Sequence, residues 1–366
     1  MKYLQRIEQI QRKLRRNKLD ALLISQPHNR RYLSGFSAAD HDIGESSGVL
    51  LIPARDNPVL LTDFRFQIQA EQEVGTMNVM LYPKGLLPLL KSLLPDLGIQ
   101  KLGFESDYTL HSVAEKMEET LKAQSISLHP LSGLVEEMRL IKDEEEIDKI
   151  RDAVLLNEAV FEELYQQIAP GQTEIEIALA IEATMRIEGA EAPSFPSIVA
   201  TGKRSALPHA VPGNVKVKKN KALMIDMGLV LDGYCSDMTR TFVPKKATKK
   251  YLKIHRLVRK AQVAATDGIR AGVSASSIDK IARTIINDAG YGKQFGHALG
   301  HGVGLAVHEN PRLSSKNRKH LRAGMVITVE PGIYLPNWGG IRLENMVVVR
   351  EDGCELLNKN TTWLDI

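Results

Sequence analysis

The chain has 366 residues, 43% of them hydrophobic and 25% charged, and this length exceeds what one ordinary hydrophobic core supports. We therefore expect a soluble globular protein of about two domains. The 48 basic and 44 acidic residues leave a formal charge of only +4, and the lysine clusters at 216–221 and 245–250 lack the interleaved aromatics of a nucleic-acid surface. These numbers argue against a nucleic-acid partner.

The sequence shows no targeting segment and no disulfide framework. The first 18 residues alternate apolar and charged residues at helical spacing, without the apolar core or cleavage site of a signal peptide. No run approaches the roughly 18 to 20 apolar residues of a membrane span. Cys235 and Cys354, the only cysteines, form neither a disulfide framework nor a cysteine metal site. The sequence predicts a cytoplasmic protein without a membrane partner.

Residues 1–133 alternate short apolar runs with amphipathic stretches, which predicts a small α/β domain. His28, Asp40, His41 and Asp42 lie after the first strand, and we expect these loop side chains to be solvated. The second domain is expected at 134–366. Strands of the first domain are expected at 21–24, 49–52, 59–61, 79–82 and 102–104, and helices at 86–94 and 112–123.

The second domain is expected to begin with one long, solvated helix at 136–156. The next helix begins at Thr173, where the threonine and Glu176 can form a capping box, and ends at Gly189. This order of elements predicts an α+β domain with two similar halves that face each other across one sheet. Strands are expected at 197–200, 222–227, 238–242, 325–329 and 341–349, and helices at 251–269 and 274–289.

Two aspartates flank a predicted hairpin in the second domain. Asp226 ends the apolar run 222–225, and Asp237 follows after the turn at 232–233. A hairpin of this length can bring both carboxylates to one side of a sheet, although aspartates beside strands also occur as surface pairs or in structural turns. The charged stretch 237–241 lies inside an apolar region and needs a partner for its charge, which favours a functional site.

Three histidines lie in the glycine-rich segment 297–309. His297 and His301 are four residues apart, but the glutamate of the zinc-protease helix is absent, and the glycines at 300, 302 and 304 disfavour a helix. We expect these glycines to permit a close, irregular backbone. His297, His301 and His308 therefore form a functional cluster in our interpretation.

Two glutamates complete the polar set. Glu330 ends the strand 325–329 before a Pro-Gly turn, and Glu344 shares a strand face with Arg342, where a plain ion pair is the alternative. An oxygen-rich set with a single imidazole suits two hydrated divalent ions better than one structural zinc. The predicted ligands are Asp226, Asp237, His301, Glu330 and Glu344.

The segments that carry these residues resemble one family. IDMGLVLDGYCSDMTRT (225–241), HALGHGVGLAVHE (297–309), TVEPGIY (328–334) and IRLEN (341–345) are similar to the motifs of the aminopeptidase P and prolidase branch of the metallopeptidases with the pita-bread fold. The first 130 residues resemble the smaller, creatinase-like N-terminal domain of this branch. The resemblance implies an Xaa-Pro dipeptidase or Xaa-Pro aminopeptidase, proline-containing peptides as substrates, and a homodimer.

The resemblance also implies a role for each ligand. Arg342 would support the bridging carboxylates from outside the metal site. By resemblance the ions are Mn²⁺, although such ligands also accept Co²⁺ or Zn²⁺. Asp226 would hold the first ion, His301 and Glu330 the second, and Asp237 and Glu344 would bridge both.

The implied reaction needs no serine or cysteine nucleophile. A pair of ions lowers the pKa of a bridging water from about 15.7 toward about 7 and so provides a hydroxide for attack on the peptide carbonyl. Glu330 would pass the proton to the leaving proline nitrogen. His308 and His209, the latter in ALPHAVPG (206–213), would contact the substrate and stabilise the oxyanion, and His297 would line the pocket.

A non-catalytic pita-bread protein that binds other proteins is the alternative. Such domains typically lose ligands, whereas all five positions are filled here. Creatinase lacks these ligands, and methionine aminopeptidase usually lacks an N-terminal domain of this kind. The sequence leaves open whether the substrates are dipeptides or longer peptides, which N-terminal residue is preferred, and what the N-terminal domain does.

Overall fold

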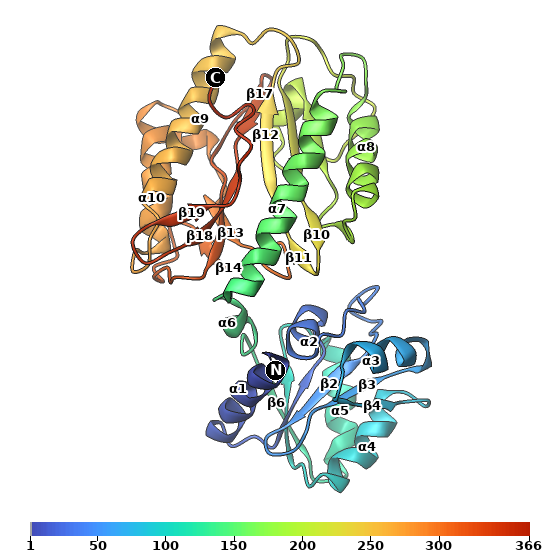
Figure 1. The fold of residues 1–366 in the computed structure, drawn as a ribbon. Helices are drawn as coiled ribbons and strands as arrows, with labels where there is room; N and C mark the ends of the chain where they lie inside the picture. The colour runs from blue at the N-terminus through green and yellow to red at the C-terminus, as the bar shows by residue number, and fades with distance from the viewer. Residues whose placement is uncertain (1) are drawn as a thin grey trace. The chain divides into compact units, whose positions relative to one another are not determined.

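The computed structural model describes residues 2–366, which divide into two compact units (Figure 1). Unit 1 ends at Arg139 and unit 2 is Leu140–Ile366, whereas the predicted first domain ends at residue 133. Residues up to 139 belong to unit 1 because the Arg139 guanidinium donates to Asn29 Oδ1 at 2.7 Å. In the described part of the chain, none of the helices combines the length and hydropathy that a membrane-spanning helix requires.

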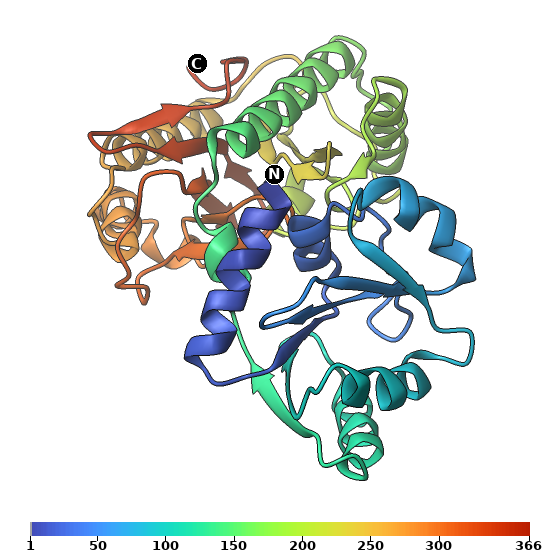
Figure 2. The ribbon, with the colours of Figure 1, turned by 60° about the horizontal axis from the view of Figure 1, so that its bottom comes forward.

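Unit 1 is built on a six-stranded mixed sheet in the order β4-β3-β2-β1-β5-β6 (Figure 2). Its core packs leucines of the strands, such as Leu51 and Leu102, against helix residues such as Leu90. The predicted strands and helices of this unit are confirmed to within two residues. The strands are β1 (Ala21–Ile24), β2 (Val49–Pro53), β3 (Val59–Thr62), β4 (Asn78–Leu81), β5 (Lys101–Glu105) and β6 (Ser127–Leu131), and the helices are α1 (Lys2–Arg16), α2 (Pro27–Ser34), α3 (Gln67–Glu73), α4 (Leu86–Asp96), α5 (His111–Lys122) and the short α6 (Glu136–Arg139).

The prediction that the polar loop after β1 is solvated is wrong for Asp40. Its carboxylate lies 3.0 Å from the Arg30 guanidinium, and the two side chains are 3% and 0% exposed. The Ser47 hydroxyl donates to the same carboxylate oxygen at 2.8 Å. A buried charge of this kind persists only when it is paired, so Asp40 is structural. His41 and Asp42 are exposed, as predicted.

Unit 2 has two halves with separate sheets, so the prediction of one shared sheet is wrong. In the first half, α7 and α8 pack on the sheet β12-β9-β8, and in the second, α9 and α10 pack on the sheet β14-β13-β15-β18-β19. The predicted capping box of Thr173 and Glu176 is confirmed at the start of α8. The two main sheets contain β8 (Ile198–Thr201), β9 (Leu223–Met227) and β12 (Met238–Phe242), and β13 (Gly300–Gly302), β14 (Glu309–Leu313), β15 (Val326–Val329), β18 (Asn345–Val349) and β19 (Cys354–Leu356).

The helices and small hairpins of unit 2 surround these sheets (Figure 1). The turn at Asp232 and Gly233, both with positive φ, closes the hairpin β10–β11 between β9 and β12. The helices are α7 (Glu144–Tyr165), α8 (Glu174–Ile187), α9 (Lys249–Asp267) and α10 (Ala275–Asp288), and the minor strands are β7 (Ala192–Pro193), β10 (Leu229–Leu231), β11 (Tyr234–Cys235), β16 (Gly332–Leu335) and β17 (Gly339–Arg342).

The predicted single helix at 136–156 is two helices. α6 ends at Arg139, and α7 begins after Asp143, which forms a capping box with Glu146. Between them, the Lys142 amide donates to Gly324 O, and its ammonium lies 3.1 Å from Glu309 in an ion pair whose side chains are 2% and 8% exposed. This long-range pair interrupts the helix, so the predicted solvated face is wrong at Lys142.

The glycines beside His301 are required by close packing of backbones. β13 pairs with β14 on one side and with β15 on the other, with an irregular register. A Cβ atom at Gly300 would overlap the carbonyl oxygen of Thr328, and one at Gly302 would overlap that of Asn310. The predicted close, irregular backbone is therefore confirmed.

Replacing Gly300 by alanine should destabilise the protein by about 1–3 kcal/mol, because the added methyl group forces β13 and β15 apart. Gly296→Ala is the matched control, since its Cβ would meet no atom within 4 Å, and a change within about 0.5 kcal/mol is expected. Urea unfolding of both variants measures the difference. Equal losses in the two variants would contradict the packing argument.

Candidate metal centre

A cavity of about 310 Å³ in unit 2 brings together residues from all the motifs that the sequence singled out. All five predicted metal ligands line it, together with Arg342 and with two of the histidines predicted to contact the substrate, His209 and His308. Its remaining walls are apolar. The lining residues are Phe195, Pro196, Ile198, His209, Ala210, Val211, Pro212, Asp226, Asp237, His301, His308, Glu330, Arg342 and Glu344.

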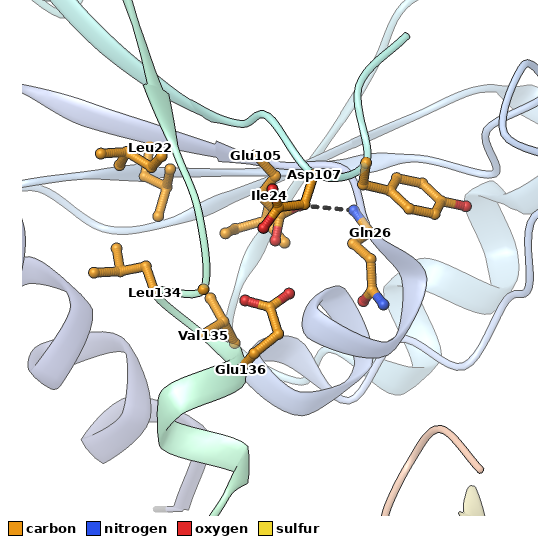
Figure 3. Close-up of a pocket in the computed structure, with 11 residues that line it drawn as sticks. Leu22, Ile24, Gln26, Glu105, Asp107, Leu134, Val135 and Glu136 are labelled. Carbon is orange, nitrogen blue, oxygen red and sulfur yellow. Dashed lines mark hydrogen bonds between the residues drawn. The ribbon is translucent and has the colours of Figure 1, made fainter. Parts of the chain in front are cut away.

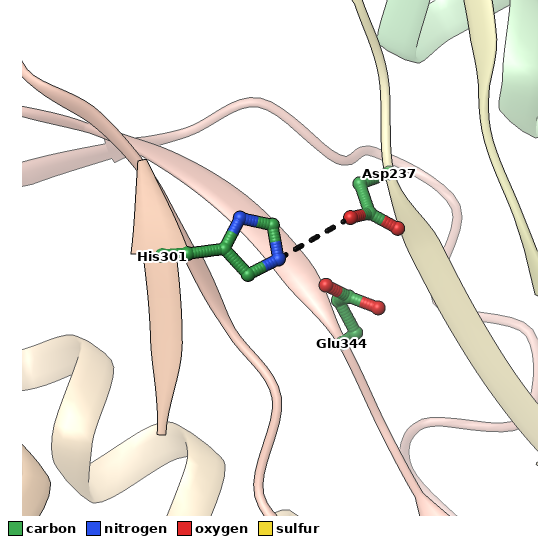
Figure 4. A group of neighbouring side chains, drawn as sticks. All are labelled: Asp237, His301 and Glu344. Carbon is green, nitrogen blue, oxygen red and sulfur yellow. Dashed lines mark ion pairs between the residues drawn. The ribbon is translucent and has the colours of Figure 1, made fainter. Parts of the chain in front are cut away.

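Three of these side chains converge most closely (Figure 4). Asp237 precedes β12, His301 lies in β13, and Glu344 lies between β17 and β18, yet one ligand atom of each lies within 4.8 Å of the others. His301 Nε2 is 3.5 Å from Asp237 Oδ2 and 3.6 Å from Glu330 Oε1. Glu330 is held where β15 ends because its amide donates to Leu299 O at 2.8 Å.

The His301 ring presents a lone pair to this group. Burial is the main cause that lowers the pKa of His301 to about 4, so the ring is neutral near pH 7. Its Nδ1 lies 3.1 Å from its neighbour's carbonyl, Gly302 O, which assigns the proton to Nδ1. The lone pair of Nε2 then faces the oxygens of two carboxyl groups. A cation between them would satisfy the nitrogen and both oxygens.

The carboxylates also lack enough donors. Burial first, and then mutual repulsion, raise the pKa of Asp237 and Glu330 well above the ordinary range and that of Glu344 to about 8. Asp226 Oδ1 and Glu344 Oε1 are buried without a hydrogen-bond partner among the described residues. Buried oxygens normally find a partner, and divalent cations accept such oxygen ligands. The residues therefore fit divalent metal ions.

Arg342 contacts a different carboxylate from the one expected. Its Nη2 donates to Asp226 Oδ2 at 2.5 Å, whereas it reaches the predicted bridging residue Glu344 only through Thr239. The Thr239 hydroxyl accepts from Arg342 Nε at 3.0 Å and donates to Glu344 Oε2 at 2.6 Å. Thr239 was not singled out from the sequence, although it lies in the charged stretch 237–241.

His297 does not line the cavity, contrary to prediction. Its Nδ1 lies 2.8 Å from Ala298 O, and its Nε2 lies 2.9 Å from the Tyr334 hydroxyl. Tyr334 in turn accepts from Arg342 Nη1 at 2.9 Å. Both ring nitrogens of His297 therefore have hydrogen-bond partners outside the cavity. Through Tyr334, His297 is linked to Arg342, which does line the cavity. Tyr334 was also missed, although it lies within the motif 328–334.

The other two predicted histidines are exposed to the cavity and to solvent. His209 follows the 3₁₀ turn Gly202–Ala206, and His308 lies before β14. The His308 ring centroid is 4.4 Å from that of His301. Burial, and then the nearby side chains of His209 and Arg312, lower the pKa of His308. Its ring is therefore neutral near pH 7 and can donate one hydrogen bond to a substrate.

A second cavity, of about 130 Å³, lies in unit 1 (Figure 3). Its buried carboxylate, Glu105, accepts from the amides of Ser25 and Gln26 at 2.7 Å each and from Asn29 Nδ2 at 2.6 Å. Burial raises the pKa of Glu105 to about 7. Asn29 also donates to Glu136 at 2.5 Å. These polar groups satisfy one another and fasten α6 to the sheet.

Several known proteins are similar to this chain over nearly its whole length. A 35% identical relative, the Xaa-Pro dipeptidase of Pyrococcus horikoshii, aligns over 94% of both chains. Among solved structures, an Xaa-Pro dipeptidase from Bacillus anthracis has a TM-score of 0.91 at 35% identity over 98% of both chains. An X-Pro aminopeptidase from Thermotoga maritima has a TM-score of 0.86 at 37% identity, over 95% of this chain and 98% of that one.

Family models match both parts of the chain. Residues 6–141 match the creatinase/prolidase N-terminal domain, and residues 148–351 match metallopeptidase family M24. The predicted fold class, a pita-bread domain preceded by a smaller creatinase-like domain, is confirmed. The chain belongs to metallopeptidase family M24, in its aminopeptidase P and prolidase branch.

Proposed function

We propose that this enzyme is an Xaa-Pro dipeptidase that works with two divalent metal ions. The observation that carries the proposal is the cavity, in which four buried or partly buried carboxylates and the neutral His301 converge beside apolar walls. The relatives named Xaa-Pro dipeptidase support the substrate class. A non-catalytic scaffold would have no need for such a set of ligands.

The residues would divide between the two ions as the family resemblance implies. His301 and Glu330 would hold one ion and Asp226 the other, and Asp237 and Glu344 would be shared. The unpartnered oxygens of Asp226 and Glu344 support cation binding by these two residues, because each has a lone pair to offer. Such ions, when bound, act as Lewis acids and lower the pKa of water toward neutrality.

The protein groups would then manage the protons. Glu330 would accept a proton from the attacking water and transfer it to the leaving nitrogen. His308 and His209 donate hydrogen bonds to the carbonyl oxygen as it gains negative charge. The nitrogen of proline is a tertiary amide, so it must receive this proton before it leaves.

The apolar walls suit a proline ring. Phe195, Pro196 and Ile198 lie on one stretch of the lining, and Val211 and Pro212 on another. The imide bond before proline has no N–H group. The site therefore needs no hydrogen-bond acceptor at that position, and apolar side chains can take its place. Apolar contact with the ring and metal contact with the carbonyl would together select an imide bond.

Arg312 supports a dipeptide over a longer peptide. It is exposed on β14, and in residues 2–366 its guanidinium has no hydrogen bond or ion pair. Burial of the His308 ring is the main cause that lowers the pKa of His308, and the charge of Arg312 lowers it further. A free cation beside the cavity can bind the carboxylate of a C-terminal proline.

Three further expectations stay predictions, the first two implied by the resemblance and the third by the lack of a targeting segment and of a disulfide framework in the sequence. They are manganese as the native metal, a homodimer, and a cytoplasmic location.

The proposed activity predicts that the metal-free chain, reloaded with Mn²⁺, hydrolyses Leu-Pro but not Leu-Ala. Asp237→Ala should lower kcat/KM by roughly 100-fold or more, because it removes a shared ligand. Asp288→Ala, an exposed aspartate at the end of α10, is the control and should retain full activity. Absence of hydrolysis in the metal-loaded chain would favour the scaffold alternative.

Arg312→Ala should raise KM for Leu-Pro by roughly 10-fold or more, because one charge-assisted contact to the C-terminal carboxylate of the dipeptide is lost. kcat should change little, and the rate on Leu-Pro amide should stay the same because that substrate has no carboxylate. Arg318→Ala, an exposed arginine six residues later, is the matched control. Equal losses on the acid and the amide would refute this role.

The stability of the metal-free enzyme should fall as the pH rises from about 5 to 8. The pKa of Glu344 is raised from 4.5 to about 8 by burial and then by Asp226, so the folded state holds a proton that the unfolded chain releases. Each pKa unit corresponds to about 1.4 kcal/mol. Thermal unfolding with a chelator present measures this slope, which Glu344→Gln should flatten and Mn²⁺ should reverse. A pH-independent midpoint in the metal-free protein would contradict the argument.

A further inference from the structure

Arg283 on α10 holds the backbone that precedes His301. Its Nε and Nη2 donate to the two oxygens of Asp279 at 2.8 and 2.7 Å. Its Nη1 donates to Phe295 O and its Nη2 to His297 O, each at 2.9 Å. The guanidinium carbon also lies 4.4 Å from the centroid of the Phe295 ring. One planar side chain therefore binds a carboxylate and two carbonyl groups at once.

Asp279 adds a third attachment to the same segment. Its carboxylate is fully buried and accepts from the Leu299 amide at 3.3 Å. Asp279 and Arg283 are four residues apart on one helix face, so they form a rigid unit. Residues 295–299 lie outside any helix or strand, and this unit fixes them at three backbone positions.

The held segment leads to the metal centre by two routes. Along the chain, Leu299 is two residues before His301. Through side chains, His297 contacts the Tyr334 hydroxyl, which contacts Arg342, which contacts Asp226. Since His297 does not reach the cavity itself, its effect on the reaction passes through Tyr334 and Arg342.

We propose that Asp279 and Arg283 are positioning residues for the reaction, which hold His297 against Tyr334 and thereby orient Arg342 and Asp226. The inference rests on the proposed function for its kinetic readout. Lysine cannot replace Arg283 in this role, because one ammonium group cannot span a carboxylate and two carbonyls in fixed geometry.

The kinetic test compares Arg283→Met and Arg283→Lys with Arg259→Met. Arg259 is the matched control, because it forms an equally bidentate ion pair with Asp365 and contacts no residue of the cavity. We expect Arg283→Met to lower kcat for Leu-Pro by roughly 10- to 100-fold with a smaller change in KM, Arg283→Lys to lie between it and the wild type, and Arg259→Met to stay within about 2-fold. Equal kcat in all variants would overturn the proposal.

A double-mutant cycle tests the route through His297. If Arg283 acts through His297, adding Arg283→Met to His297→Gln should cause little further loss of kcat. Additive losses would overturn the route through His297.

Hydrogen exchange gives a readout independent of activity. In the metal-free protein, Arg283→Met and Arg283→Lys should raise amide exchange in residues 296–301, the Leu299 amide included, and Arg259→Met should leave these amides unchanged. Unchanged exchange in both Arg283 variants would refute the positioning role even if Leu-Pro were not a substrate. A wild-type enzyme without Leu-Pro activity would instead refute the proposed function, and the exchange result would still decide this inference.

Discussion

The constraint on which unit 2 depends is the crowding of buried carboxyl groups around one cavity. Four carboxylates line it against one guanidinium, that of Arg342, which a hydrogen bond commits to Asp226. Removing a carboxylate from water costs several kcal/mol, and nearby carboxylates add repulsion to that cost. A fold that tolerates this arrangement must either protonate the group or bind cations. The neutral His301, with its lone pair toward the same oxygens, favours cations.

The two-sheet architecture determines how this crowding arises. Asp226 and Asp237 belong to the half that packs α7 and α8, whereas His301 and Glu330 belong to the half that packs α9 and α10. Glu344 joins them, since its amide donates to Thr239 O across the two halves. Neither half alone contains a complete ligand set. Metal binding and the packing of the two halves are therefore linked in free energy.

The five predicted ligands line one cavity, and several of them could be singled out because they lie in or beside readable local patterns. Asp226 lies near the end of a strand and Glu330 directly after one, both strands have readable apolar runs, and the glycines at 300 and 302 disfavour a helix around His301. The features that were missed depend on distant partners. Lys142 lies between two helices in a buried pair with Glu309, Asp40 is buried beside Arg30, and His297 contacts the Tyr334 hydroxyl and does not line the cavity. No local pattern contains these pairings.

A chain of hydrogen-bonded side chains outside the cavity lining leads to Asp226 and restricts the orientation of its carboxylate. From Arg283 to His297, Tyr334, Arg342 and Asp226, each contact joins a donor to an acceptor whose other partners are also fixed. Burial raises the pKa of Tyr334 to about 12, so its hydroxyl keeps the proton that it shares with His297. Dipoles fixed in this way need no reorganisation when charge develops on the substrate. The hydrogen bonds from α10 to Asp226 thus form one continuous chain within the protein and need no ligand in the cavity.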